Sequence, residues 1–188
     1  MAGPAGVDIG YEDDEDIGLV RAAQADPTHF AFLYERYRHR VYSYLRLRAG
    51  ESEAEDLTQQ VFVQALAALP HYSPRLPFGA WLFRIARNAA IDRGRRRRTV
   101  PWEALPANLQ PIATDNPEAH LLEHETRTHL RVLLTALDPS TRELLLLRFA
   151  GRLTAREIAP VVGISETAVH KRIARALHRL KERYDELA

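Results

Sequence analysis

Apolar residues recur at intervals of three or four along most of the chain, which is the period of one face of an α-helix. In residues 28–49, for example, Phe30, Leu33, Tyr37 and Val41 keep this spacing, so we expect a long amphipathic helix there. The same pattern predicts further helices at about 12–25, 52–69, 78–97 and 117–137. The expected fold class is therefore all-α.

Helix boundaries are indicated by capping residues. Asp26 followed by Pro27 is typical of a helix start, and Gly50 is typical of a helix end. A Ser or Thr followed three residues later by Glu has the spacing of a capping box, in which the two side chains satisfy two free backbone N–H groups. We expect a helix to begin at each of three such pairs, which are Ser52/Glu55, Ser140/Glu143 and Thr154/Glu157.

Residues 154–183 read as a short helix, a tight turn and a long helix. Gly163 suits a turn that needs positive φ, and Ser165 is a good N-cap for the second helix. The small Ala159 and the apolar Val169 lie where a helix-turn-helix needs a close crossing and a packing residue. Pro160 removes a hydrogen bond inside the first helix, so we expect a kink or a shortened helix there, with the motif retained.

The long second helix has two distinct faces when its residues are placed at 100° intervals. Its apolar face holds Val169, Ile173, Ala176, Leu177, Leu180 and Tyr184. Its outer face holds Thr167, Ala168, Lys171, Arg172, Arg175 and Arg179. Small polar and basic side chains on the N-terminal half of such a helix can enter the major groove of DNA. The alternative is the solvated basic face of an ordinary helical bundle.

A loop between Pro70 and Pro77 leads into the helix expected at 78–97. The loop carries His71, Tyr72, Ser73 and Arg75. The inward face of the helix holds Phe78, Leu82, Ile85, Ala86 and Ala89, with Trp81 at the margin. Its outer face holds Arg84, Arg87, Asn88, Ile91 and Arg95. Arginine and asparagine beside aromatic loop residues suit phosphate contacts and the capture of unstacked bases.

The helix expected at 52–69 has a polar face that includes one apolar residue. Its core side holds Leu57, Val61, Ala65, Ala68 and Leu69, widened by Phe62 and Leu66. Asp56, Gln59, Gln60 and Val63 project from the opposite side. Val63 within this polar face indicates a contact with another protein, although single exposed valines also occur on ordinary surfaces.

Charge is segregated along the chain although the net charge is only +1. Acids cluster between Asp8 and Asp16, and arginines cluster between Arg84 and Arg98, which favours a polyanionic partner. The absence of cysteine excludes disulfides and thiolate metal sites and fits a cytoplasmic protein. No apolar run is long enough for membrane insertion, and the pattern of a signal peptide is not expected at the N-terminus.

The segments EAEDLTQQVFVQAL and PFGAWLFRIARNAAIDRGRRRR, followed by the helix-turn-helix, resemble an alternative sigma factor of the extracytoplasmic-function (ECF) group of the sigma-70 family. The similarity spans about 19–98 and 120–183, with the motifs in the expected order. It implies two small helical domains joined by a flexible linker, the second being a helix-turn-helix domain. The expected boundaries are a disordered acidic tail at 1–11, region 2 at 12–98, the linker at 99–116 and region 4 at 117–188.

The resemblance also implies partners and residue roles. The chain would bind core RNA polymerase through the β′ clamp and the β subunit, recognise promoter DNA and help to melt the −10 element, without being an enzyme or using a cofactor. The resemblance is also compatible with an anti-sigma factor as a further partner. The residues that match the β′-docking segment are Asp56, Gln59, Gln60 and Val63, and the family usually has Glu at the position of Gln60. Those that match the −10 elements are His71, Tyr72, Arg75, Arg84, Arg87, Asn88 and Arg95, and those for −35 are Ser165, Thr167, Ala168, Lys171, Arg172, Arg175 and Arg179.

Two other classes of function stay open. A helix-turn-helix repressor or activator that acts without polymerase would bind duplex DNA strongly on its own. His120, Glu123 and His124 have the H-x-x-E-H order of an inverted zincin, although no third ligand is identifiable and we expect no metal. Metal analysis of the purified protein would test that metallohydrolase alternative.

Overall fold

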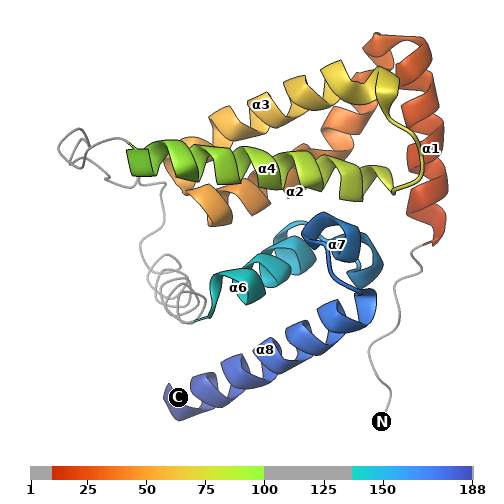
Figure 1. Cartoon of the computed structure of the whole chain (residues 1–188). Helices are drawn as coiled ribbons and strands as arrows, with labels where there is room; N and C mark the ends of the chain where they lie inside the picture. Colours follow the sequence, from red (N-terminus) through yellow and green to blue (C-terminus); the bar gives the residue numbers. More distant parts are fainter. Residues whose placement is uncertain (1–9, 100–136, 188) are drawn as a thin grey trace, which may run out of the picture.

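The computed structural model describes residues 10–99 and 137–187, which are helical and contain no strand (Figure 1). The long helices are α1 Gly10–Ala25, α2 Phe30–Ala49, α3 Glu51–Ala68, α4 Phe78–Thr99 and α8 Glu166–Leu187, and the short ones are α6 Pro139–Leu145 and α7 Ala155–Val162. Turns of 3-10 helix at Pro27–His29 and Leu69–His71 flank α2 and α3, and a π-helical turn at Leu146–Ala150 follows α6. The expected all-α class is confirmed.

Helices α1–α4 form the N-terminal domain, in which α2 packs against α1, α3 and α4. The apolar residues of α2 that the spacing directs inward are buried: Phe30, Leu33, Tyr37, Val41, Tyr44 and Leu45. Asp16 of α1 is buried beside them, where Arg36 Nε lies 3.1 Å from its carboxylate and the Tyr37 hydroxyl donates a hydrogen bond to it. Charge pairing therefore accompanies the burial of an acid, as it must in a low-dielectric interior.

Helices α7 and α8 form the expected helix-turn-helix. The Thr154 hydroxyl accepts a hydrogen bond from Glu157 N at 3.1 Å, and the Glu157 carboxylate accepts one from Thr154 N at 2.7 Å, which confirms the capping box. Gly163 has a left-handed φ of 76°, and the Ser165 hydroxyl accepts from the backbone N–H three residues on at 3.2 Å. The helical path of α7 continues through Pro160, so the motif is retained.

The other two predicted capping boxes are wrong. No side chain caps α3, because Gly50 with φ 103° joins α2 directly to Glu51 and leaves no room for a cap at Ser52. Glu55 is exposed on the surface of α3. The single glycine both ends one helix and begins the next, which its lack of a Cβ permits.

At the start of α6 the cap is Asp138 and not Ser140. The Asp138 carboxylate accepts from Thr141 N at 3.0 Å and from the Ser140 hydroxyl at 2.6 Å, and Pro139 occupies the first helical position. Asp-Pro is thus the start signal here, as it also is at residues 26–27. Glu143, expected in the capping box, is instead buried at the junction between the domains.

The two domains pack against each other and share one hydrophobic core. The π-helical turn lies against α2, and α7 lies against α4 (Figure 1). Phe83 of α4 belongs to the same buried cluster as Leu147 and Leu153 of the C-terminal domain.

A polar contact lies at the same junction. Glu143 is only 7% exposed, and its carboxylate accepts from the Tyr44 hydroxyl at 2.5 Å and from Arg48 Nε at 2.7 Å. Burial, and then the Glu143 charge, raise the pKa of Tyr44 well above its usual range, so the hydroxyl stays protonated and donates.

Two helices extend beyond their predicted ranges. Helix α1 begins at Gly10, inside the segment expected as a tail, and α4 extends through Thr99, the first residue of the expected linker. The rest of the tail and of the linker, most of the helix expected at 117–137, and the H-x-x-E-H residues His120, Glu123 and His124 lie outside the described residues.

Candidate nucleic-acid interface

The outer face of α8 presents its polar and basic side chains to solvent. Ser165, Thr167, Lys171, Arg172, Arg175 and Arg179 are exposed, and Ala168 is half-buried. The face is fixed in place because Val169 and Ala176 on the opposite side of α8 are buried. A helix held in this way by a helix-turn-helix can lay its N-terminal half in a major groove of DNA.

The outer face of α4 is a second basic surface, located on the other domain. Arg84, Asn88 and Arg95 are exposed, as expected from their spacing. Arg87 differs from them because it is half-buried, and its Nε lies 3.8 Å from the Glu143 carboxylate of the C-terminal domain. This ion pair could not be predicted from the periodicity of α4.

The loop before α4 contains both exposed and buried candidates. His71 and Arg75 are exposed. Tyr72 is 9% exposed, its hydroxyl donates to Leu76 O at 2.6 Å, and its ring centroid lies 4.9 Å from that of Trp81. The interpretation of Tyr72 as an accessible ring for unstacked bases is therefore wrong for this structure; the half-buried Trp81 is the neighbouring aromatic with exposed area.

The polar face of α3 is exposed as predicted, and it is more apolar than expected. Asp56, Gln59 and Gln60 are exposed, and Val63 is 68% exposed. Leu66 was assigned to the core side, but it is 40% exposed and lies one turn from Val63 on the same side of the helix. Two exposed apolar residues next to each other strengthen the case for a protein contact on this face.

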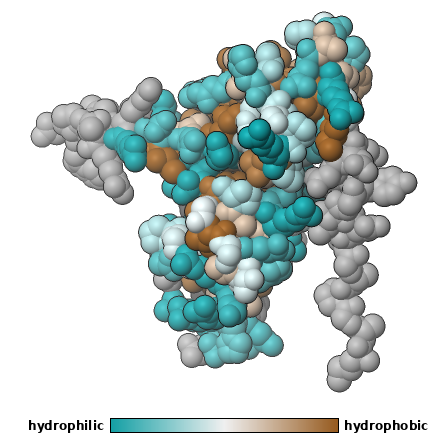
Figure 2. All heavy atoms as spheres, turned by 45° about the vertical axis from the view of Figure 1, so that its right-hand side comes forward, coloured by the Kyte–Doolittle hydropathy of each residue, from teal (hydrophilic) through white to brown (hydrophobic). Residues whose placement is uncertain are grey.

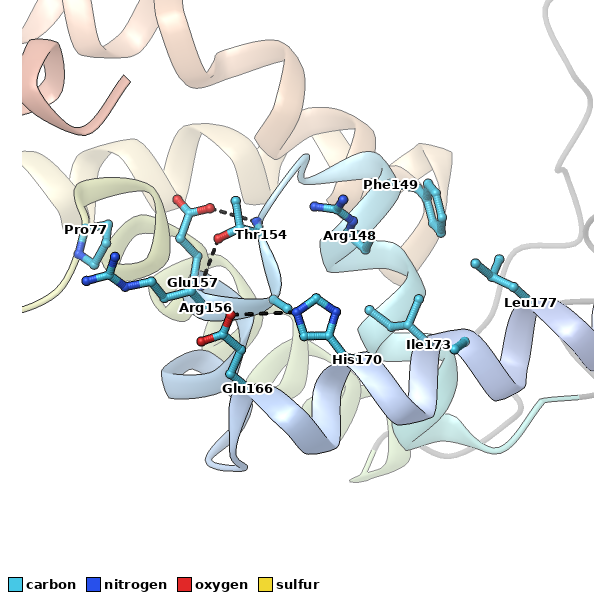
Figure 3. A pocket seen from close by; sticks show the side chains of 12 residues that line it. Pro77, Arg148, Phe149, Thr154, Arg156, Glu157, Glu166, His170, Ile173 and Leu177 are labelled. Carbon is cyan, nitrogen blue, oxygen red and sulfur yellow. Dashed lines mark hydrogen bonds and ion pairs between the residues drawn. The ribbon is translucent and has the colours of Figure 1, made fainter. Parts of the chain in front are cut away.

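The C-terminal domain, together with Pro77 of the loop before α4, lines an open groove of about 600 Å³ that the sequence did not indicate (Figure 3). Its apolar residues include Phe149, 58% exposed, and Leu177, 42% exposed. The helical spacing predicted that Leu177 would face the core. Charged and polar side chains of Arg148, Arg156 and His170 also line it. On the face shown in Figure 2, hydrophilic side chains cover most of the surface, with apolar patches between them.

Within residues 10–99 and 137–187, no group of three His, Asp or Glu side chains is placed to hold a metal ion. None of the helices in that part of the chain is long and apolar enough to cross a membrane.

Comparison with known proteins identifies the family. Residues 33–100 match the family described as Sigma-70 region 2, and residues 128–180 match Sigma-70, region 4. The chain is 35% identical over 176 residues to the ECF RNA polymerase sigma factor SigD of Mycobacterium tuberculosis, covering 89% of this chain and 82% of SigD. The chain belongs to the ECF group of the sigma-70 family. ECF relatives also include SigE of Mycolicibacterium smegmatis, 31% identical over 153 residues, which cover 80% of this chain and 59% of SigE.

The sigma factor CnrH of Cupriavidus metallidurans is 31% identical over 183 residues, covering 93% of this chain and 96% of CnrH. A solved structure of CnrH in complex with the cytosolic domain of CnrY matches the fold with a TM-score of 0.68 at 27% identity, covering 92% of this chain and 99% of that chain. As an ECF sigma factor, the protein directs promoter recognition by RNA polymerase. This confirms the resemblance seen in the sequence and disfavours the repressor alternative.

Proposed function

We propose that α8 reads the −35 element as duplex DNA, while α4 and the loop before it bind and help to open the −10 element. The observation that carries this proposal is the presence of two exposed basic faces on separate domains, one on α8 and one on α4. Each face alone offers few phosphate contacts, so each would bind DNA weakly and with strong salt dependence. Two such sites tethered on one polymerase would bind a promoter far more tightly than either site alone.

The side chains divide into two kinds of contact. Lys171 and Arg175 lie in the first turns of α8, where a recognition helix reaches base edges, and Arg179 lies where it would meet backbone phosphate. On α4, Arg84 and Asn88 are the candidates for the −10 bases. The remaining candidates, which would contact phosphate or help to position the DNA, are Ser165, Thr167, Ala168, Arg172, His71, Arg75, Arg87 and Arg95.

Core polymerase would bind the same chain through two further surfaces. The exposed face of α3, with Asp56, Gln59, Gln60 and Val63, would dock on the β′ clamp, and Leu66 extends this face. The groove lined by Phe149 and Leu177 is the candidate for the β subunit, since these two large apolar side chains are exposed beside each other in it.

The protein would act in the cytoplasm, where promoter DNA is located, and it would regulate transcription without catalysing a reaction of its own. An anti-sigma factor is a further proposed partner, because the similar protein CnrH has been solved in complex with the cytosolic domain of CnrY. We also propose the domain boundaries expected from the sequence, with region 2 at 12–98 and region 4 at 117–188.

The proposed function is tested by promoter binding and transcription with the full chain. The free protein should bind promoter duplex weakly, and adding core polymerase should produce a specific complex and run-off transcripts from a promoter library. Tight duplex binding by the protein alone, unchanged by core polymerase, would instead support the regulator that acts without polymerase.

A further inference from the structure

The loop before α4, which carries the −10 candidates His71 and Arg75, is poor in backbone hydrogen-bond donors. Pro70, Pro74 and Pro77 lie in it, and a proline has no N–H group. A segment with few N–H groups cannot satisfy its own carbonyl groups. A defined shape for this loop therefore depends on donors from side chains.

The first such donor is Gln24, in the last turn of α1. Helix α1 lies against the 3-10 turn at the start of the loop (Figure 1), and Ala23 beside Gln24 is buried. Gln24 Nε2 donates to Leu69 O at 2.9 Å and to Tyr72 O at 3.0 Å. A glutamine amide has two N–H groups, so one side chain can satisfy both carbonyls. Because His71 lies between them in the chain, Gln24 holds both ends of the short segment that contains His71.

The second donor is Tyr72, which belongs to the loop itself. Its hydroxyl donates to Leu76 O at 2.6 Å. Its ring is fixed by packing, since its centroid lies 5.9 Å from that of Phe78 and 4.9 Å from that of Trp81, and the residue is only 9% exposed. The hydroxyl therefore closes the segment from Tyr72 to Leu76, which contains Arg75.

We propose that Gln24 and Tyr72 are positioning residues for the −10 element, with Gln24 holding His71 and Tyr72 holding Arg75 in the conformation that contacts DNA. This inference rests on the proposed binding of −10 by the loop. Both positioned side chains are exposed, while the backbone that carries them is held by hydrogen bonds. A preformed loop binds more tightly than a loose one, because less conformational entropy is lost when the complex forms.

The first test measures the loop in the free full chain, by NMR-detected hydrogen exchange of backbone amides. The Tyr72 amide donates to Leu69 O at 3.0 Å and reports on the segment held by Gln24. Q24A, and the nearly isosteric Q24E whose carboxylate has no N–H to donate, should both speed its exchange. Y72F should speed exchange at the amide of Arg75. The buried Val169 of the helix-turn-helix should exchange at the wild-type rate in every variant.

The second test measures binding of core polymerase carrying the full chain to a promoter fragment that is unpaired over −10. The promoter comes from those recovered by run-off transcription. Q24A and Y72F should each weaken binding about 3–10-fold, the equivalent of one neutral hydrogen bond. H71A and R75A should weaken it at least as much, because they remove the contacts themselves. Gln64→Ala loses the same amide from exposed α3 and should match wild type in both tests.

Double variants distinguish positioning from a general loss of stability. A positioning residue acts through the residue that it holds, so Q24A should cost much less in the H71A background than in wild type. For the same reason, Y72F should cost much less in the R75A background. A residue that only stabilises the domain would cost the same in either background.

Unchanged exchange at the Tyr72 amide in both Q24A and Q24E, or a full-sized effect of Q24A in the H71A background, would overturn the inference for Gln24. The matching results for Y72F, at the Arg75 amide and in the R75A background, would overturn it for Tyr72. If H71A and R75A both bind the unpaired promoter as wild type does, the proposed −10 role of the loop fails, and the positioning role fails with it. The two failures are distinguishable, because H71A and R75A still weaken binding when only the positioning role is wrong.

Discussion

The ring of Phe83 packs directly against Gly151, where a side chain would clash with it. A Cβ built on Gly151 would lie 2.8 Å from Phe83 Cε1 and 2.7 Å from Leu147 O. The φ of Gly151 is −74°, so space and not backbone conformation requires glycine here. Phe83 is fully buried in the shared core, although its spacing did not place it with the inward residues of α4. The aromatic ring of α4 thus packs against the backbone of the C-terminal domain at Gly151.

The first prediction is that Gly151→Ala destabilises the protein by about 1–3 kcal/mol, because an overpacked junction must shift backbone or ring. Urea unfolding of the full chain measures the effect. Gly94→Ala is the control, because Gly94 is an exposed residue of α4 and no atom lies within 4 Å of a Cβ added to it. This control substitution should leave the stability unchanged or raise it slightly. F83L in the Gly151→Ala background should recover part of the loss; no recovery would mean that Leu147 O alone sets the cost.

Helical spacing predicted the elements and the exposed faces because both depend on neighbours within one helix. The outward orientation of Asp56, Arg84 and Arg175 follows from the period of 3.6 alone. Phe83 and Glu143 could not be placed in this way, since their partners lie in the other domain and no local pattern encodes them. The spacing of Glu143 from Ser140 even suggested a cap, but the Asp138-Pro139 signal was the stronger one.

The spacing also failed to predict that two apolar residues are exposed, for a related reason. Leu66 and Leu177 both fall near the apolar side of their helices, and only the packing of neighbouring helices decides how far that side is covered. Both residues border surfaces that we propose bind polymerase. In the sequence, an apolar residue that faces a partner protein has the same spacing as one that faces the core.

The second prediction concerns docking on core polymerase. Asp56→Arg should weaken core binding and transcription while the helical content stays unchanged, because Asp56 is exposed on α3. Glu55→Arg makes the same charge change on the same helix, about 100° away, and should have a smaller effect. Competition for core polymerase between labelled wild type and each variant measures this. Equal competition by wild type and Asp56→Arg would remove Asp56 from the docking surface.

The third prediction concerns opening at −10. Replacing Arg84 or Asn88 by Ala should slow open-complex formation on duplex promoters, because both side chains are exposed on α4 beside the loop. A promoter already melted over −10 should restore part of the activity if the defect lies in opening. Permanganate footprinting of unpaired thymines follows the opening, and unchanged rates in both variants would exclude this face from the site.

The fourth prediction concerns acid stability at the start of α6. Hydrogen bonds, first from the Ser140 hydroxyl and then from Thr141, lower the pKa of Asp138 below its usual range. A lowered folded-state pKa means that this stabilisation is present above the unfolded pKa of about 3.9 and is lost as the pH falls through the folded-state value. D138N keeps an N-cap that does not titrate, so its thermal midpoint should fall less than that of wild type below about pH 4. Parallel midpoints across that range would show that the cap does not contribute.

The last prediction separates base contacts from phosphate contacts on α8. Lys171 and Arg175 are exposed in the first turns of the helix, so removal of either side chain should cost roughly 1–3 kcal/mol and relax the preference at one −35 position. Arg179 is exposed farther along, so Arg179→Ala should weaken all sequences alike and flatten the salt slope by about one unit. Transcription from a randomised −35 library distinguishes the two outcomes, because only a lost base contact changes which sequences are selected. Identical selected sequences for wild type, Lys171→Ala and Arg175→Ala would show that α8 does not read bases through these residues.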